Sequence, residues 1–309
     1  MAITSGIQWT DATFNPWIGC TQVSPACDNC YAMVMNSHRQ WAKGWGPGVP
    51  RHRTSASNWR QPLTWNRKAG KEGKRIKVFC ASLADVFDSE VPDVWRTDLW
   101  NLILETPNLD WLLLTKRTSS IARMVPWTND WPDNVWIGTS VENQIFANRR
   151  LPILSEIQAK VRFISAEPLL GDFSLGDFNI DWVIAGGESG SGWREMNVDH
   201  VRSLRDQCRE RDIAFFFKQY SGFNPHDLGR EVDGVEWNQF PLNSVYNLEQ
   251  KMSQKTNEKL KQISIEKVYR FSGQEFRKVS TAELKNPEVE IVPFDFKGKR
   301  VFFTPVSAV

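Results

Sequence analysis

Three cysteines lie close together near the start of the chain, at Cys20, Cys27 and Cys30, in a C-x6-C-x2-C pattern. Thiolates bind zinc and iron, and the two-residue step lets two sulfurs reach one ion or one edge of a cluster. Three thiolates would leave one iron of a 4Fe-4S cluster without a protein ligand. Such an open iron can bind the amino and carboxylate groups of S-adenosylmethionine (SAM), so the spacing predicts an iron–sulfur cluster that works with SAM.

A closed zinc site is the alternative for the same loop. His38 would complete a tetrahedral Cys3His set, and such sites are structural. The remaining cysteines, Cys80 and Cys208, fall at the end of an expected strand and on an expected helix face, where a buried apolar role is usual. Because Cys80 lies beside the expected site, it is also a candidate catalytic thiol that donates hydrogen.

The composition places these cysteines in a reducing environment. The chain has 309 residues, of which 41% are hydrophobic and 24% charged, as in ordinary soluble globular proteins. No apolar stretch approaches the roughly 20 residues of a membrane-spanning helix, and the first fifteen residues lack the pattern of a signal peptide. We therefore expect a cytoplasmic protein with no membrane partner, whose cysteines are ligands, catalytic groups or core residues rather than disulfides.

Six short runs rich in β-branched or aromatic residues alternate with stretches of helical pattern. Most runs are apolar on both faces, as buried parallel strands are, so the pattern predicts an α/β fold with either an open sheet or a barrel. After Gln219 the pattern changes to a loop-like stretch over 221–241, and we expect a small β-rich extension over 245–309 with a short helix over 251–262. The expected strands are 76–81, 111–115, 135–138, 161–165, 182–185 and 214–217, and the expected helices are 92–105, 145–157 and 198–211.

Each expected strand is followed by polar residues or glycine. Parallel sheets assemble their sites at the carboxyl ends of the strands, so we expect a single polar mouth. Three carboxylates in it, Glu142, Glu167 and Glu188, either bind ribose and substrate or pair with arginines. Glu142 and Glu167 are candidate catalytic groups, whereas Gly186, Gly187 and Glu188 are candidate cofactor contacts, because glycine allows close backbone approach. The arginines are Arg117, Arg149 and Arg194; the other strand-end groups are Ser82, Asp85, Lys116, Ser140, Lys218 and Gln219.

The segment 38–77 is strongly basic and rich in tryptophan. It contains eleven Lys or Arg residues against one acid, Glu72, and four tryptophans at irregular spacing. Cations can neutralise phosphates and exposed indoles can stack on unpaired bases, which predicts a nucleic-acid surface. The alternative is a solvated basic face over buried tryptophans. The candidate contacts are Arg51, Arg53, Arg60, Trp59 and Trp65.

Several motifs together resemble a family of three-cysteine-motif proteins common in phages and prophages, most of unknown function. The resemblance covers roughly residues 7–241. Its motifs are WT at 9–10, NP at 15–16, the cysteine segment 19–32, ASLADVF at 81–87, LLLTKR at 112–117, GTSVEN at 138–143, EPLLG at 167–171, GGESG at 186–190 and FFFKQ at 215–219.

That family is similar in turn to radical SAM enzymes, especially the branch of spore photoproduct lyase and related DNA-repair lyases, although the first cysteine interval here is three residues longer than usual. The resemblance implies a partial (β/α) TIM-like barrel of about six parallel strands over residues 1–244, with the cluster loop at its mouth. It also implies that Ser82, Lys116 and Ser140 contact SAM. The implied activity is radical chemistry on a nucleic-acid base or nucleotide, such as DNA modification or repair, with a reductant such as a flavodoxin.

Two other functions remain open from the sequence. One is a zinc-stabilised nucleic-acid-binding protein without catalysis. The other is a radical enzyme that acts on a peptide or small metabolite and uses the basic segment to dock a partner protein.

Overall fold

The computed structural model describes residues 5–127 and 129–241, together with four strands in the carboxyl-terminal region. The chain divides into two compact units, Met1–Ser244 and Val245–Val309. No helix in the described part of the chain has the length and apolar character needed to cross a membrane. The helix expected over 251–262 lies outside the described residues.

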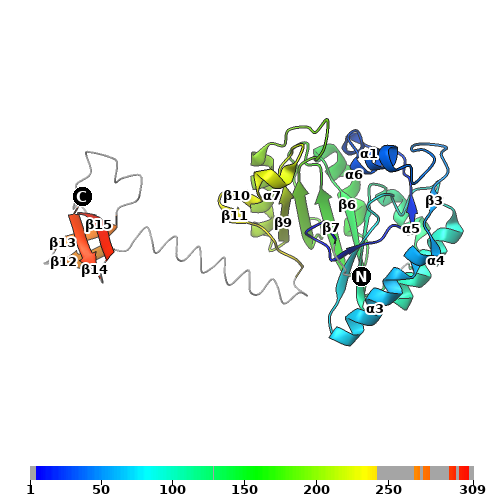
Figure 1. Ribbon diagram of the computed structural model, residues 1–309, viewed down its shortest axis with the longest axis horizontal. Coiled ribbons are helices and arrows are strands. Elements are labelled where there is room, and N and C mark those ends of the chain that lie inside the picture. The colour runs from blue at the N-terminus through cyan, green and yellow to red at the C-terminus, as the bar shows by residue number, and fades with distance from the viewer. Residues whose placement is uncertain are drawn as a thin grey trace. The chain divides into compact units, whose positions relative to one another are not determined.

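The first unit contains a sheet of seven parallel strands curled into a half-barrel (Figure 1). The order of the strands in the sheet follows their order in the chain, which fits a barrel rather than a doubly wound sheet. All six expected strands are confirmed as β4 to β9, and β1 is an additional strand that is too short to give a sequence signal. The strands are β1 (Ala12–Thr13), β4 (Ile76–Cys80), β5 (Leu109–Thr115), β6 (Val135–Ser140), β7 (Val161–Ala166), β8 (Trp182–Gly186) and β9 (Ala214–Gln219).

Helices cover the outer face of the half-barrel, and apolar side chains fill both faces of the sheet. Along β5, Trp111 and Leu113 belong to the outer core beneath the helices, whereas Leu112 between them belongs to the inner core. This alternation explains why the strands appear apolar on both faces in the sequence. The main covering helices are α3 (Gln61–Glu72), α4 (Asp93–Glu105), α6 (Gln144–Ser155) and α7 (Val198–Glu210).

The inner face is filled by a cluster of aromatic rings. Trp182 lies at its centre, with its ring centroid 5.8 to 6.4 Å from those of Trp9, Trp136, Phe163 and Phe216. Large rings of this kind bury much apolar area per residue. Polar residues line open space near the carboxyl ends of the strands.

Shorter helices and strands lie in the loops of the first unit, and four strands form the second unit. The loop before β4 contains β2 (Trp17–Ile18), η1 (Pro25–Cys27), α1 (Tyr31–Arg39), β3 (His52–Arg53) and α2 (Ala56–Trp59); η2 (Thr118–Ser120) and α5 (Ile121–Met124) follow β5, and η3 (Pro225–Leu228), β10 (Glu231–Val232) and β11 (Val235–Glu236) follow β9. The second unit is an antiparallel sheet in the order β12 (Val268–Phe271), β13 (Gln274–Lys278), β15 (Lys299–Pro305) and β14 (Val292–Phe296). The small β-rich extension expected there is confirmed.

The aromatic filling predicts the effect of a single added methyl group. Gly138 on β6 pairs with Phe163 on β7, and a Cβ at residue 138 would lie 2.4 Å from the Phe163 ring. Gly138→Ala should therefore lower the free energy of unfolding by about 1–3 kcal/mol through overpacking. Urea unfolding followed by tryptophan fluorescence measures this for the first unit, because all fifteen tryptophans lie within it.

The matched control is Gly6→Ala, since no atom lies within 4 Å of a Cβ at that position. Equal unfolding midpoints for the two variants would contradict the packing of Phe163 against β6.

Candidate functional site

A pocket of about 320 Å³ opens at the carboxyl ends of the strands. Its volume falls in the range of small-molecule sites. The structure brings seven of the expected site residues together around it: Cys20, Cys27, Cys30, Ser82, Lys116, Ser140 and Glu167. Its floor includes Trp9, Phe79 and Leu114 from the inner core, so polar walls stand above an apolar base.

The three cysteines reach this pocket from one loop. Cys20 follows β2, Cys27 ends η1, and Cys30 precedes α1 as its N-cap; all three are half-buried free thiols. The pKa of Cys20 is raised to about 12, mainly because the thiol is buried and secondly because the Asp85 carboxylate is near. The positive charge of Arg117 lowers this pKa but does not offset the two other effects.

The three thiols line one pocket, but they are not gathered closely enough to hold one ion. Among the residues that the structure describes, no three His, Cys, Asp or Glu side chains form a group able to hold a metal ion. His38 is exposed on α1 and does not line the pocket, so the Cys3His set is not formed. In a four-iron cluster each cysteine binds a different iron. The cysteine sulfurs therefore lie farther apart than the ligands of one metal ion do. Three thiols around one pocket fit that group.

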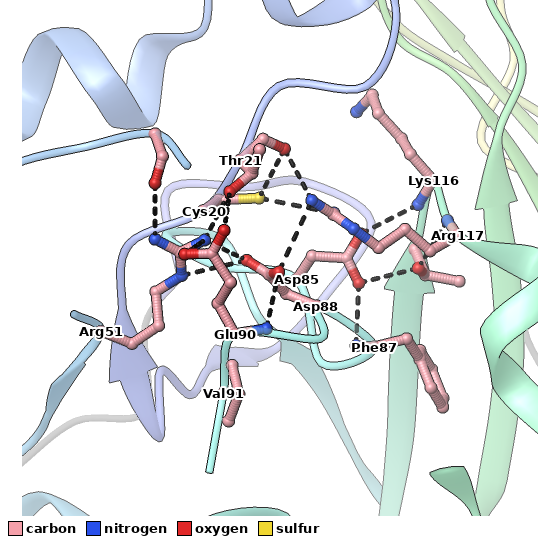
Figure 2. Close-up of polar contacts among 12 residues, drawn as sticks. Cys20, Thr21, Arg51, Asp85, Phe87, Asp88, Glu90, Val91, Lys116 and Arg117 are labelled. Atoms are coloured by element: carbon pink, nitrogen blue, oxygen red, sulfur yellow. Dashed lines mark hydrogen bonds and ion pairs between the residues drawn. The ribbon is translucent and has the colours of Figure 1, made fainter. Parts of the chain in front are cut away.

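Arg117 attaches the cysteine loop to the sheet (Figure 2). Its Nη2 donates to the carbonyl oxygen of Thr21 at 2.7 Å, and its Nη1 donates to Asp85 at 2.8 Å. The same Nη1 lies 3.6 Å from Sγ of Cys20. Asp85 is fixed in turn by Thr115, whose hydroxyl donates to it at 2.7 Å. One arginine therefore links the loop to the ends of two strands.

Arg51 forms the other half of this attachment and corrects a prediction. Its side chain has no exposed surface and donates to Asp88 through Nε at 3.0 Å and Nη2 at 2.7 Å. Nη2 also donates to the hydroxyl of Thr21 at 2.6 Å. The expectation that Arg51 contacts nucleic acid is therefore wrong, because a fully buried, paired guanidinium cannot reach a phosphate.

A second attachment holds the other end of the cysteine loop. Glu188 accepts hydrogen bonds from Asn29 at 3.0 Å and from Arg194, which also donates to the carbonyl oxygen of Pro25 at 2.8 Å. Burial raises the pKa of Glu188, but the bonds from Arg194 and Asn29 outweigh it and leave the pKa below its ordinary value. Glu188 does not line the pocket, so the structure gives it a positioning role.

The three pocket residues expected to bind a cofactor differ in whether they already have a hydrogen-bond or ion-pair partner in the protein. Ser82 Oγ accepts from the side-chain amide of Asn15 at 3.0 Å. Ser140 Oγ is buried and has no hydrogen-bond partner among the residues described. Lys116 is half-buried, extends away from Asp85 in Figure 2, and has no ion pair with any residue that the structure describes. Ser140 and Lys116 are thus available to a ligand.

Glu167 shares the pocket with a lysine that the sequence left undecided between the mouth and solvent. Nζ of Lys218 lies 2.8 Å from Oε1 of Glu167, and Ser165 donates to Oε2 at 3.3 Å. Both charged residues line the pocket. Only the position of Lys218 at the end of β9 could have signalled this role.

Four other candidates do not line the pocket. Cys80 is fully buried among apolar residues, and burial raises its pKa, so its interpretation as a catalytic thiol is corrected. Glu142 is also fully buried, in a 2.7 Å ion pair with Arg150 rather than Arg149, and this corrects its catalytic role. Gly186 and Gly187 serve packing: a Cβ on Gly187 would lie 2.2 Å from the Ser221 hydroxyl.

Three more of the candidate nucleic-acid contacts, Arg53, Trp59 and Trp65, are half-buried and have internal contacts. Arg53 pairs with Asp98 at 2.8 Å, and its guanidinium lies 4.2 Å from the ring centroid of Trp59. Trp59 and Trp65 both pack against the outer core. Of the five candidate nucleic-acid contacts, Arg60 is the one classed as exposed.

Comparison with known proteins identifies the family. The chain belongs to the family described as protein of unknown function DUF5131, whose model matches residues 4–241. No curated protein matches it.

Solved structures of spore photoproduct lyase are similar in overall arrangement. One, complexed with dinucleoside spore photoproduct, has a TM-score of 0.41 and 9% identity, with 81% of this chain and 74% of that chain covered. A mutant with bound AdoMet and the dinucleoside has a TM-score of 0.40 with the same identity and coverage. Likeness at this level assigns no activity and no residue role.

The buried position of Arg51 predicts a large effect on stability. Arg51→Ala should lower the free energy of unfolding by about 3–5 kcal/mol, because it removes the hydrogen-bonded charge partner of the buried Asp88 carboxylate and leaves only the more distant Arg117 at 3.8 Å. Urea unfolding followed by tryptophan fluorescence measures the loss.

Arg60→Ala is the control, since Arg60 is exposed in the same basic segment and exposed substitutions usually change stability by less than about 0.5 kcal/mol. If both variants unfold at the same urea concentration, Arg51 does not anchor the loop.

Proposed function

We propose that this protein is a radical SAM enzyme, with a 4Fe-4S cluster held by Cys20, Cys27 and Cys30. One observation carries the proposal. The three thiols of a single loop line the same pocket as Lys116 and Ser140, which stand at the carboxyl ends of two neighbouring parallel strands. Sites of parallel α/β folds are assembled at this edge.

The protein's own residues suit the binding of a zwitterionic cofactor beside a cluster. Within the described ranges, Lys116 has no ion pair and so offers a cation for a carboxylate, and Ser140 offers a buried hydroxyl that lacks a partner. The apolar floor formed by Trp9, Phe79 and Leu114 keeps water from the reacting groups. When bound, the cluster and SAM supply a 5′-deoxyadenosyl radical, with the electron delivered by a reductant such as a flavodoxin.

Removal of one cysteine should abolish both metal and activity. We expect the anaerobically reconstituted protein to hold about four irons with matching sulfide, and to form 5′-deoxyadenosine from SAM after reduction. Cys27→Ala should lose most of the iron and reduce 5′-deoxyadenosine formation at least about 100-fold. Metal analysis and chromatography of the product measure both.

Cys208→Ala is the matched control, because Cys208 is buried on α7, outside the pocket. A wild-type protein with about one zinc, no sulfide and no cleavage of SAM would contradict the proposal and favour the zinc-stabilised binding protein.

We further propose that the substrate is a nucleic-acid base or nucleotide, with an unpaired strand lying on the rim of the pocket. Two exposed aromatic residues support this, Trp193 at 40% and Phe223 at 74% exposed. The loop of Trp193 adjoins the cysteine loop, since Gly192 accepts from Asn29 at 2.7 Å. The loop of Phe223 adjoins the loop of Trp193, since Gly190 donates to the carbonyl of Phe223 at 3.3 Å. Exposed rings stack on unpaired bases.

Truncation of these rings should weaken binding of single-stranded DNA. Trp193→Ala and Phe223→Ala should each lose about 1–3 kcal/mol, or roughly 5- to 150-fold in affinity, measured by fluorescence anisotropy with a labelled oligonucleotide.

Leu104→Ala is the control, at a side chain 54% exposed near the end of α4 and outside the pocket. If Arg60→Ala weakens binding and the aromatic variants do not, the strand binds the basic segment rather than the rim.

A further inference from the structure

We infer that Arg117 is a positioning residue that sets the reduction potential of the cluster, by donating a hydrogen bond to the sulfur of Cys20. This inference rests on the proposed function, because it concerns the ligand of the proposed cluster. It assigns to Arg117 a task distinct from binding SAM or substrate.

The donor is held in place from several sides (Figure 2). Nη1 of Arg117 lies 3.6 Å from Sγ of Cys20, within hydrogen-bonding range for sulfur. The rest of the guanidinium is fixed by Asp85 and the Thr21 carbonyl, and the backbone N–H of Arg117 donates to the Thr115 hydroxyl at 2.9 Å. Only 12% of the side chain is exposed. A guanidinium with so many fixed contacts has little freedom to leave the sulfur.

The hydrogen bond from Arg117 should become stronger when Cys20 binds iron. As a thiol, Cys20 donates its own proton toward the Thr21 carbonyl, with a sulfur–oxygen distance of 3.5 Å. As a thiolate bound to iron it has no proton to donate, and the N–H of Arg117 then bonds to a negatively charged acceptor. Hydrogen bonds of that kind are about twice as strong as neutral ones.

The three ligands are not equivalent in this respect. Among the described residues, the sulfurs of Cys27 and Cys30 accept no side-chain hydrogen bond, whereas Cys20 does. Hydrogen bonds to the sulfurs are one of the factors that set cluster potentials. In the described part of the chain, Arg117 is therefore the one side chain that donates a hydrogen bond to a sulfur of the cysteine loop.

The surrounding charges determine the direction of the effect. Arg117 is paired with Asp85 and lies 3.8 Å from Asp88, and both carboxylates are almost completely buried. Reduction adds an electron, which nearby negative charge opposes and nearby positive charge favours. Loss of Arg117 removes a hydrogen bond to the sulfur and leaves Asp85 without its charge partner. Both changes make the cluster harder to reduce.

The test compares midpoint potentials of the reconstituted full chain. We expect Arg117→Gln to lower the ratio of reduced to oxidised cluster about tenfold at a fixed potential, which equals a shift of −59 mV for one electron. Arg117→Lys keeps the positive charge but loses the several N–H donors of the guanidinium. Its midpoint potential should therefore lie between those of the wild type and Arg117→Gln. An anaerobic redox titration followed by electron paramagnetic resonance gives the potentials, with iron and sulfide measured on the same samples.

Arg75→Gln is the matched control. Arg75 also binds one carboxylate, Asp110 at 2.8 Å, together with the backbone carbonyls of Pro107 and Leu109, but it precedes β4 at the opposite end of the sheet. The midpoint potential of the cluster in the Arg75→Gln variant should equal that of the wild type.

The outcomes separate this inference from the proposed function. A wild-type protein that holds no cluster overturns both. A cluster of full iron content whose potential is the same in the wild type, Arg117→Gln and Arg117→Lys overturns the role of Arg117 and leaves the proposed function standing. If Arg117→Gln does not fold, the Arg117→Lys variant decides, since its potential either falls below or equals that of the wild type.

Discussion

The site depends on a buried set of ion pairs that binds the cysteine loop to the sheet. Arg51 and Arg117 donate to two different oxygens of one residue, Thr21, and pair with Asp88 and Asp85 behind it. Buried charges of this kind are strongly destabilising when one partner is lost. The loop that contains the three cysteines is therefore attached by interactions that are costly to break one partner at a time.

The second attachment explains how the loop crosses the mouth of the half-barrel. Arg117 follows β5, whereas Glu188 follows β8, so the two attachment points are separated by the ends of β6 and β7. The polar groups at those two ends, Ser140 and Glu167, lie on the pocket wall. The pocket is thus bounded by the loop and by the strands that the loop crosses, which is the region where a cofactor could contact both.

The sequence predicted those parts of the molecule that follow from local patterns. The six main strands could be found because each is apolar on both faces, and the pocket could be anticipated because parallel strands end at one edge. Arg51 could not be assigned, since its partner Asp88 is 37 positions away and a basic residue looks the same whether buried or exposed. The same ambiguity applies to Trp59, which is half-buried and packs against the outer core.

Both attachments are made entirely from protein groups, and this has a consequence for ligand binding. Asn29, Arg117 and Arg194 fix the loop on both sides of Cys27 through contacts that require no metal. A loop ordered in this way loses less conformational entropy when it takes up a cofactor than a free loop of the same length would. The longer interval between Cys20 and Cys27 is compatible with that order, because Arg51 and Arg117 hold its start at Thr21 and Arg194 holds its end at Pro25. The segment between Cys20 and Cys27 is therefore anchored near both of its ends by arginines.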